Sequence, residues 1–289
     1  MHASFSSISK FIAVVATVFM VACTDPDQCS DRPALRPTTS LPLLQTGHPP
    51  VRATYETVLA AFNQHTIPGL KVSGVNQGID TSMLLIELDN RRFEPSIVTA
   101  DRVNTGLSPV DAMRSGSYGV LIGSSFVSAG NPLIPVGLLR KRDQVLSELQ
   151  IHGYTRILGL TPHGLGVIGH RVYERDLFAS ALQLGPGIVE QGELDISERD
   201  LTRPRYFRSF VALCADRTIL GATIVPMHLR TVGAQFLRFA DASHLQCDEV
   251  VNLAGDRETI IAVSSDAGVT FLGHSDHARV AMLKFTNTP

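Results

Sequence analysis

Residues 207–225 read FRSFVALCADRTILGATIV, and this stretch decides the fold class. Two apolar runs, Phe207 to Cys214 and Thr218 to Val225, flank the three-residue connection Ala215-Asp216-Arg217. Short runs rich in β-branched and aromatic residues on both sides of such a connection are typical of a β-hairpin. The sequence therefore predicts two antiparallel strands in the second half of the chain.

The segments that follow this hairpin predict one helix and three more strands. Apolar residues recur with helical spacing from Thr231 to Ala242, and Thr231 is the expected N-cap. Glu249 to Leu253 and Thr259 to Val263 are expected strands on either side of a glycine turn. Val280 to Phe285 is the last expected strand.

The segments before the hairpin predict mainly strands. Tyr55 to Gln64 has helical spacing with Thr54 as the expected N-cap, and Ser108-Pro109 opens a short helix that ends by Gly116. The expected strands lie at residues 82–88, 95–100, 118–122, 135–140, 156–160 and 165–168. Because strands are many and helices few, the sequence predicts an α+β domain with mostly antiparallel or mixed sheets and one or two packed helices.

The first 22 residues have the features of an export signal. Phe11 to Ala22 is an unbroken apolar run that would rise only about 18 Å as a helix, which is too short for a hydrocarbon core of about 30 Å. The run ends at Met20-Val21-Ala22-Cys23, which resembles a bacterial lipobox, although leucine is usual where Met20 stands. We expect residues 1–22 to be a signal peptide and Cys23 to be the lipidation site. The alternative is an ordinary cleaved signal with a nearby cysteine.

The next segment, Thr24 to Pro50, contains six prolines. Proline lacks an N–H group and restricts the residue before it, so this stretch is expected to resist both helix and sheet pairing. We expect residues 23–50 to be an extended tether and residues 51–289 to be the folded domain. Lipid on Cys23 would anchor the protein to a membrane of the cell envelope, either facing the periplasm or on the outer membrane.

Composition and charge disfavour several classes of protein. A formal net charge of −2, the absence of tryptophan and the lack of a basic stripe disfavour nucleic-acid binding. Of the four cysteines, Cys214 and Cys247 are the favoured disulfide partners, because Cys23 is the expected lipidation site and Cys29 lies in the expected tether. No CxxC spacing suggests zinc, and we expect neither a metal nor another cofactor.

Several separated segments resemble, in the same order, the phosphodiester glycosidases. Gly119 to Phe126 (GVLIGSSF) occupies the place of a family strand that ends in Asn-Gly-Gly-Phe-Phe. Ala181 to Gly192 is similar to a family segment centred on Gly-Pro, and Arg208 to Leu213 matches a strand that opens with a family arginine. Val250 to Leu253 matches the strand that runs into Asn-Leu-Asp-Gly-Gly. The resemblance covers roughly residues 75–263 and implies a hydrolase that releases a sugar from a sugar phosphodiester.

The resemblance fails at positions where the family has polar groups or glycine. Ile122 stands where the family has the asparagine of Asn-Gly-Gly-Phe-Phe, and Ala254 stands where it has the aspartate of Asn-Leu-Asp-Gly-Gly. Asp256 replaces the second glycine of the latter motif, which removes φ freedom and adds a charge at a turn. Arg208 and Asn252 match the family.

The chemistry of such a reaction assigns roles to the remaining residues. A cation must hold the phosphate, a carboxylate must activate water or attack the anomeric carbon, and donors must position the sugar. The resemblance gives the phosphate to Arg208, and Asp256 is the candidate catalytic carboxylate, with Glu258 also nearby in the sequence. The candidate substrate-binding residues are Gly123, Ser124, Asn252 and Gly255.

Two functions therefore remain open. In the first, the chain is an envelope lipoprotein that hydrolyses sugar-phosphate or amino-sugar linkages, with a sugar phosphodiester or cell-surface glycan as its partner. In the second, it keeps the groove but not the catalysis, and binds a glycan or a protein partner. The loss of polar groups at both Ile122 and Ala254 is the feature that separates these two functions. A purely structural lipoprotein is a third class.

Two histidine pairs have spacing that metal sites use, and both have a simpler interpretation. His163 and His170 flank a hairpin-like segment, and His274 is followed by His277. Exposed histidines in turns are commoner than metal ligands, so these pairs do not change the expectation that no metal is bound.

Overall fold

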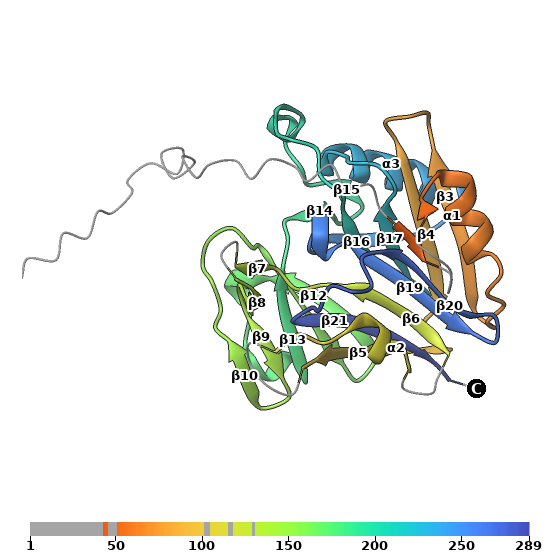
Figure 1. Ribbon diagram of the computed structural model, residues 1–289. Coiled ribbons are helices and arrows are strands. Elements are labelled where there is room, and N and C mark those ends of the chain that lie inside the picture. The colour runs from red at the N-terminus through yellow and green to blue at the C-terminus, as the bar shows by residue number, and fades with distance from the viewer. Residues whose placement is uncertain (1–42, 46–50, 101–104, 115–117, 129–130, 289) are drawn as a thin grey trace, which may run out of the picture. The chain divides into compact units, whose positions relative to one another are not determined.

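The computed structural model describes residues 43–45, 51–100, 105–114, 118–128 and 131–288 (Figure 1). Within them, antiparallel sheets and three α-helices confirm the predicted α+β class. The expected signal peptide, the expected lipidation site Cys23 and residues 24–42 of the expected tether lie outside the described residues. No helix of the described part of the chain is both long and apolar enough to cross a bilayer.

The predicted hairpin lies inside a seven-stranded sheet, here called the hairpin sheet. Its two strands pair antiparallel, with Phe210 opposite Gly221. In spatial order the sheet consists of β15 (Glu193–Leu194), β14 (Gly187–Glu190), β18 (Cys247–Asn252), β16 (Ser209–Cys214), β17 (Arg217–Thr223), β4 (Ser82–Asp89) and β3 (Leu70–Asn76). A disulfide joins Cys214 to Cys247 across β16 and β18, as the sequence predicted.

A second seven-stranded sheet contains the last strand and is here called the terminal sheet. In spatial order it consists of β2 (Val51–Arg52), β1 (Leu43–Gln45), β20 (Gly268–Gly273), β19 (Ile260–Ser265), β6 (Gly119–Gly123), β21 (Ala281–Asn287) and β5 (Phe93–Thr99). Strand β1 corrects the expectation that the whole of residues 23–50 resists pairing, because it pairs with β20. Residues 43–48 contain no proline, so this part of the expected tether can donate N–H groups to a ladder.

A five-stranded sheet and a two-stranded ladder complete the strands of the described residues. The former consists of β10 (Gln144–Ser147), β9 (Leu139–Lys141), β13 (Ser180–Leu184), β11 (Arg156–Thr161) and β12 (Gly164–Gly169), and the latter of β7 (Val127–Ser128) and β8 (Asn131–Pro135). The single strand expected at residues 135–140 is wrong. Gly137 has φ +84°, a left-handed conformation that turns the chain between β8 and β9.

The hairpin sheet is buried on both faces, which explains the unbroken apolar run of β4. Leu84 and Ile86 belong to the core that also contains Ile261 and Leu283 of the terminal sheet. Met83, which points to the other face because side chains alternate along a strand, packs in the core that contains Val232 and Phe236 of α3. Figure 1 shows this order: α3 lies along one side of the hairpin sheet and the terminal sheet along the other.

Three α-helices pack on these sheets within the described residues. They are α1 (Tyr55–Phe62), α2 (Pro109–Arg114) and α3 (Leu229–Ala242). The Thr54 hydroxyl accepts the N–H of Thr57 and caps α1, as predicted. The predicted cap of α3 is wrong, because the helix begins at Leu229, before Thr231. The N–H of Arg230 donates instead to a carboxylate that is distant in sequence, Asp200 Oδ2, at 2.9 Å.

Candidate functional site

A pocket of about 580 Å³ lies where the chain enters β16 and leaves β18. Six parts of the chain form it: the loop after β6, the loop before β11, the connection between β13 and β14, the segment from Asp195 to Arg208, the start of α3 and the end of β18. The lining residues are Phe126, Gly153, Tyr154, Gly185, Pro186, Asp195, Ile196, Ser197, Asp200, Arg203, Pro204, Tyr206, Arg208, Leu229 and Asn252. Arg208 and Asn252, two of the residues singled out from the sequence, therefore lie in one pocket.

Arg208 is positioned by backbone pairing just before β16. Its N–H donates to Thr223 Oγ1 at 2.8 Å, and its guanidinium carbon lies 4.9 Å from the centre of the Tyr206 ring. Its Nε is buried and has no hydrogen-bond partner. Burial lowers the pKa of Arg208, and the negative charges of Asp200 and Asp256 oppose that shift. The ring and the backbone contact fix the guanidinium without neutralising it.

A second cation, Arg203, lines the same pocket. It lies near enough to Arg208 for its positive charge to lower the pKa of that residue further. Within the described residues, neither arginine belongs to an ion pair. Two guanidinium groups in one pocket, both without a carboxylate partner there, are suited to binding an anion.

Asn252, at the end of β18, contacts both the pocket and the β13–β14 connection. Its Nδ2 donates to the carbonyl of Gly185 at 3.1 Å, and its backbone N–H donates to the carbonyl of Pro186 at 3.1 Å. Its Oδ1 is buried and accepts no hydrogen bond. The residue therefore holds one wall of the pocket and keeps one acceptor unused.

An aromatic wall faces these polar groups. The rings of Phe126 and Tyr154 lie with their centroids 4.7 Å apart. Buried Gln183 holds the Tyr154 loop, because its amide Nε2 donates to the carbonyls of Gln150 and Tyr154 at 2.5 and 2.9 Å. Its Oε1 accepts the N–H groups of Leu138 and Gln150 at 3.0 and 2.8 Å. A side chain whose hydrogen-bonding groups are all used in this way rigidifies the loop.

Two carboxylates line the pocket, and the sequence analysis missed both. Asp200 lies on the 3-10 helix η4 (Glu198–Thr202) and is the one buried residue of that helix. Asp195 is exposed, and its Oδ2 forms an ion pair with Arg156 Nη2 at 2.9 Å. Partial desolvation of its carboxyl raises the pKa of Asp195, an effect that Arg156 opposes. Both residues lie in a segment without helical or strand periodicity, so no local pattern drew attention to them.

The predicted residues Gly255 and Asp256 lie behind Arg208 and do not line the pocket. Asp256 has φ +51°, so the turn keeps the left-handed backbone for which glycine is best suited. Its Oδ1 accepts the N–H of Phe207 at 3.3 Å, and burial raises its pKa. A Cβ on Gly255 would lie 2.7 Å from the carbonyl oxygen of Phe207, so this glycine is required by packing.

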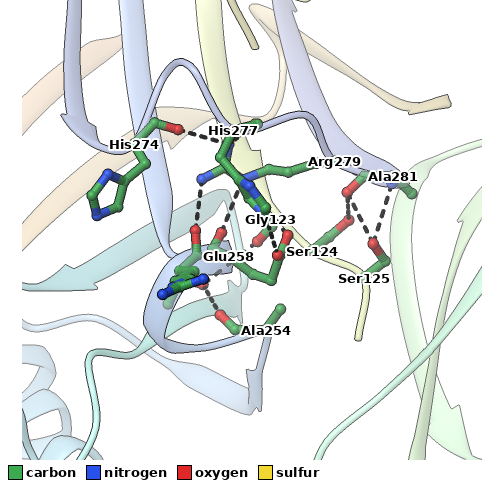
Figure 2. A network of polar contacts seen from close by, with 11 residues as sticks. Gly123, Ser124, Ser125, Ala254, Glu258, His274, His277, Arg279 and Ala281 are labelled. Carbon is green, nitrogen blue, oxygen red and sulfur yellow. Dashed lines mark hydrogen bonds and ion pairs between the residues drawn. The ribbon is translucent and has the colours of Figure 1, made fainter. Parts of the chain in front are cut away.

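The predicted residues Gly123 and Ser124 also lie outside the pocket lining, in a neighbouring polar network (Figure 2). Ser124 Oγ donates to the carbonyl of Ala281 at 3.2 Å. A Cβ on Gly123 would lie 2.3 Å from the carbonyl oxygen of Glu258. Ser209 Oγ, 2.6 Å from the carbonyl of Ala254 and 3.5 Å from that of Gly123, connects the two family motifs. The two motifs therefore lie close together, and the groups that connect them are their backbone carbonyls and the Ser209 hydroxyl.

The two positions that depart from the family are part of the protein core. Ile122 is fully buried, and it pairs with Ile261 and Leu283 in the terminal sheet. Ala254 has an exposure of 1%. Neither side chain can contribute a polar group.

Two of the histidines with metal-like spacing, His170 and His277, have protein partners. Figure 2 shows His277 and Arg279 converging on Glu258, and His277 Nε2 lies 2.7 Å from Glu258 Oε1. His170 contacts the carbonyls of Thr155 and Ile151 at 3.2 and 3.1 Å. The described part of the chain contains no group of three or more side chains arranged to hold a metal ion.

Comparison with known proteins gives a likeness of fold. No family model matches the chain, and no curated protein matches it in sequence. The catalytic domain of zebrafish N-acetylglucosamine-1-phosphodiester alpha-N-acetylglucosaminidase, auto-inhibited by a pro-peptide, superposes with a TM-score of 0.54 at 13% identity, over 77% of this chain and 85% of that one. A hypothetical protein from Synechocystis superposes with a TM-score of 0.51 at 10% identity, over 75% of this chain and 62% of that one. At these identities the likeness concerns the fold alone.

Proposed function

We propose that the pocket binds the phosphate of a sugar phosphodiester and that the protein hydrolyses the bond between the sugar and that phosphate. The observation that carries the proposal is the unpaired Arg208 beside Arg203. A half-buried guanidinium whose buried Nε has no partner is unfavourable, and a bidentate phosphate contact would satisfy two of its N–H donors at once. A phosphate needs little protonation to leave, so the anion site supplies much of the required chemistry.

The remaining walls of the pocket suit the sugar. Asn252 has an acceptor without a hydrogen bond, and the tilted rings of Phe126 and Tyr154 supply apolar contact area for the C–H face of a sugar ring. The fold shared with an N-acetylglucosamine phosphodiester glycosidase supports the same substrate class. A GlcNAc-1-phosphate ester is therefore the first probe to use.

A second candidate function is binding without catalysis. It is favoured by the buried apolar residues Ile122 and Ala254, which stand where the family has polar ones. This function would use the same pocket, with a cell-surface glycan or a protein partner in place of a cleaved substrate.

The cell envelope is the proposed location. The disulfide between Cys214 and Cys247 is typical of an oxidising compartment, which supports export. The anchor would be lipid on Cys23. Mass spectrometry of the mature protein tests it, because a diacylglyceryl-modified Cys23 at the new N-terminus is expected and a mature chain that begins elsewhere would refute it.

Arg208→Ala tests the anion site. We expect GlcNAc-1-phosphate methyl ester to bind the purified full chain in calorimetry, and the variant to bind it about 10²-fold more weakly, because a charged hydrogen-bonded contact is lost. Arg114→Ala removes an exposed arginine that pairs with Asp111, and serves as the matched control. Equal affinity in wild type and Arg208→Ala would refute the assignment. Release of free GlcNAc by the wild type then separates hydrolysis from binding alone.

A further inference from the structure

The pocket contains a buried carboxylate, Asp200, whose position is set by tertiary structure. Asp200 has an exposure of 9%, although the other residues of the 3-10 helix η4 face solvent. Its Oδ2 accepts the N–H of Arg230 in the first turn of α3 at 2.9 Å. No hydrogen bond of the described residues ends on Oδ1. One oxygen is therefore held in place by the helix, and the other is left for a ligand or a water molecule.

Asp200 also lies within electrostatic reach of the proposed phosphate site. Burial lowers the pKa of Arg208, and among the charges that oppose this shift the charge of Asp200 has the largest effect. The two residues line one pocket without forming a direct ion pair. A carboxylate near a guanidinium, but not bonded to it, leaves room between them for the atoms of a substrate.

Three other carboxylates of this region each lack one of these features. Asp256 lies outside the pocket lining, and its Oδ1 accepts the N–H of Phe207. Asp195 uses its Oδ2 in the ion pair with Arg156. Glu258 contacts His277 in the neighbouring network. Among these residues, Asp200 alone combines burial, a fixed orientation and a free oxygen within the pocket.

We propose that Asp200 is the general base of the pocket, in place of the carboxylate that is missing at Ala254. This rests on the proposed hydrolysis of a sugar phosphodiester. Asp200 Oδ1 takes a proton from water as the water oxygen bonds to the anomeric carbon. The bond between that carbon and the phosphate oxygen breaks, and its electron pair stays on the phosphate held by Arg208. The products are the free sugar and a phosphate monoester, and Asp200 then returns the proton to solvent.

Asp200→Asn is the variant that tests the proposal. The amide keeps an oxygen that can accept the Arg230 N–H, so α3 stays capped, but it cannot take a proton. With GlcNAc-1-phosphate methyl ester, we expect kcat to fall about 10³-fold while the Kd from calorimetry changes less than threefold. The acid limb of the pH–kcat profile should disappear from the residual activity. Asp111→Asn, an exposed change on α2, is the control for a lost carboxylate.

Four further results test the proposal. Sodium azide should accelerate Asp200→Ala and yield a glycosyl azide, because a small anion can enter the vacated space. Asp256→Asn is expected to retain most of the activity, and a 10³-fold loss there in place of Asp200→Asn would overturn the proposal. Wild-type protein that binds the ester without cleaving it would also overturn it while leaving the anion site intact. Wild-type protein that does not bind the ester would overturn the anion site, and the role of Asp200 with it.

Discussion

Arg208 and Arg279 are two arginines that folding removes largely from water, and their surroundings are opposite. Arg279 has an exposure of 1%, and all three of its nitrogens donate to carbonyls: Nε to Glu258 at 3.2 Å, Nη1 to His274 at 2.8 Å and Nη2 to Arg257 at 3.0 Å. Burial lowers the pKa of Arg279 to about 10, and the negative charge of Glu258 opposes the shift. Arg208 has only the face of Tyr206 and an Nε without a partner.

The difference teaches that burial alone does not mark a functional arginine. The guanidinium of Arg279 connects three segments of the chain, and its donors are used inside the protein (Figure 2). The guanidinium of Arg208 borders a pocket and its donors are not used by the described residues. Removing Arg279 should therefore damage the fold, and removing Arg208 should damage binding.

The largest expected effect is on the stability of Arg279→Met. This change leaves the carbonyls of four residues, those of Arg257, Glu258, His274 and His277, and the Glu258 carboxylate without a buried cation. It should lower the free energy of unfolding by about 3–5 kcal/mol. Arg208→Ala should change it by no more than about 1 kcal/mol, because within the described residues the guanidinium donates no hydrogen bond and forms no ion pair, and its aromatic contact is the Tyr206 ring. Urea denaturation monitored by circular dichroism measures both. Equal losses would show that the two arginines play the same role.

The next largest effect concerns the opposite end of the strand pair that carries the pocket. Strands β16 and β18 are joined at one end by the disulfide, and at the other end lie Arg208 and Asn252. The double variant Cys214→Ser, Cys247→Ser opens a loop of 33 residues, which should lower stability by about 3–4 kcal/mol on chain-entropy grounds. The affinity for the phosphate ester should stay within about threefold at a temperature where the variant is folded. A joint loss of stability and affinity would show that the pocket depends on the distant disulfide.

Much of the fold follows from local sequence. The hairpin at residues 207–225, the apolar run of β4 and the helical spacing of α3 each predict the observed element, because each records burial on one or two faces. The predicted start of α3 failed for a tertiary reason. Its first turn is capped by Asp200 rather than by Thr231, and no local pattern shows a cap that comes from elsewhere in the chain.

The candidate site likewise contains residues that sequence motifs locate and residues that only tertiary contacts place. Arg208 and Asn252 could be selected from motifs, since each adjoins a strand that the motif locates, and both line the pocket. Gly123 and Gly255 were selected from the same motifs, but the nearest backbone oxygen leaves no room for a Cβ at either position. Asp200 could not be selected, because its position depends on the contact between η4 and α3. Motifs thus located the strands of the site, and tertiary packing decides which side chains reach the pocket.

A third arginine, Arg156, differs from both Arg208 and Arg279 because two carboxylates share it. Its Nη2 lies 2.9 Å from both Glu190 Oε2 and Asp195 Oδ2, and Glu249 faces Glu190 across the strand pair β14–β18. Burial, with the nearby charges of Glu190, Asp195 and Asp248, raises the pKa of Glu249 to about 7, although Arg156 opposes the shift. Arg156 is a single positive charge beside several carboxylates, so it cannot neutralise all of them. Arg208, by contrast, forms no ion pair within the described residues.

The smallest expected effect comes from the excess of negative charge around Arg156. Since the pKa of Glu249 is higher in the folded protein than its ordinary value of 4.5, folding favours the protonated carboxyl. The contribution of this protonated carboxyl to the stability of the fold is fully present below about pH 4.5 and is lost as the pH rises through about 7. Glu249→Gln should therefore raise stability at pH 8 by about 1 kcal/mol, a value reduced by solvent screening, and give no gain at pH 4. Urea denaturation at the two pH values measures the difference, with the exposed Glu94→Gln on β5 as control. A gain at pH 4 as large as that at pH 8 would mean that the amide packs better than the carboxyl, and that charge crowding around Arg156 does not limit stability.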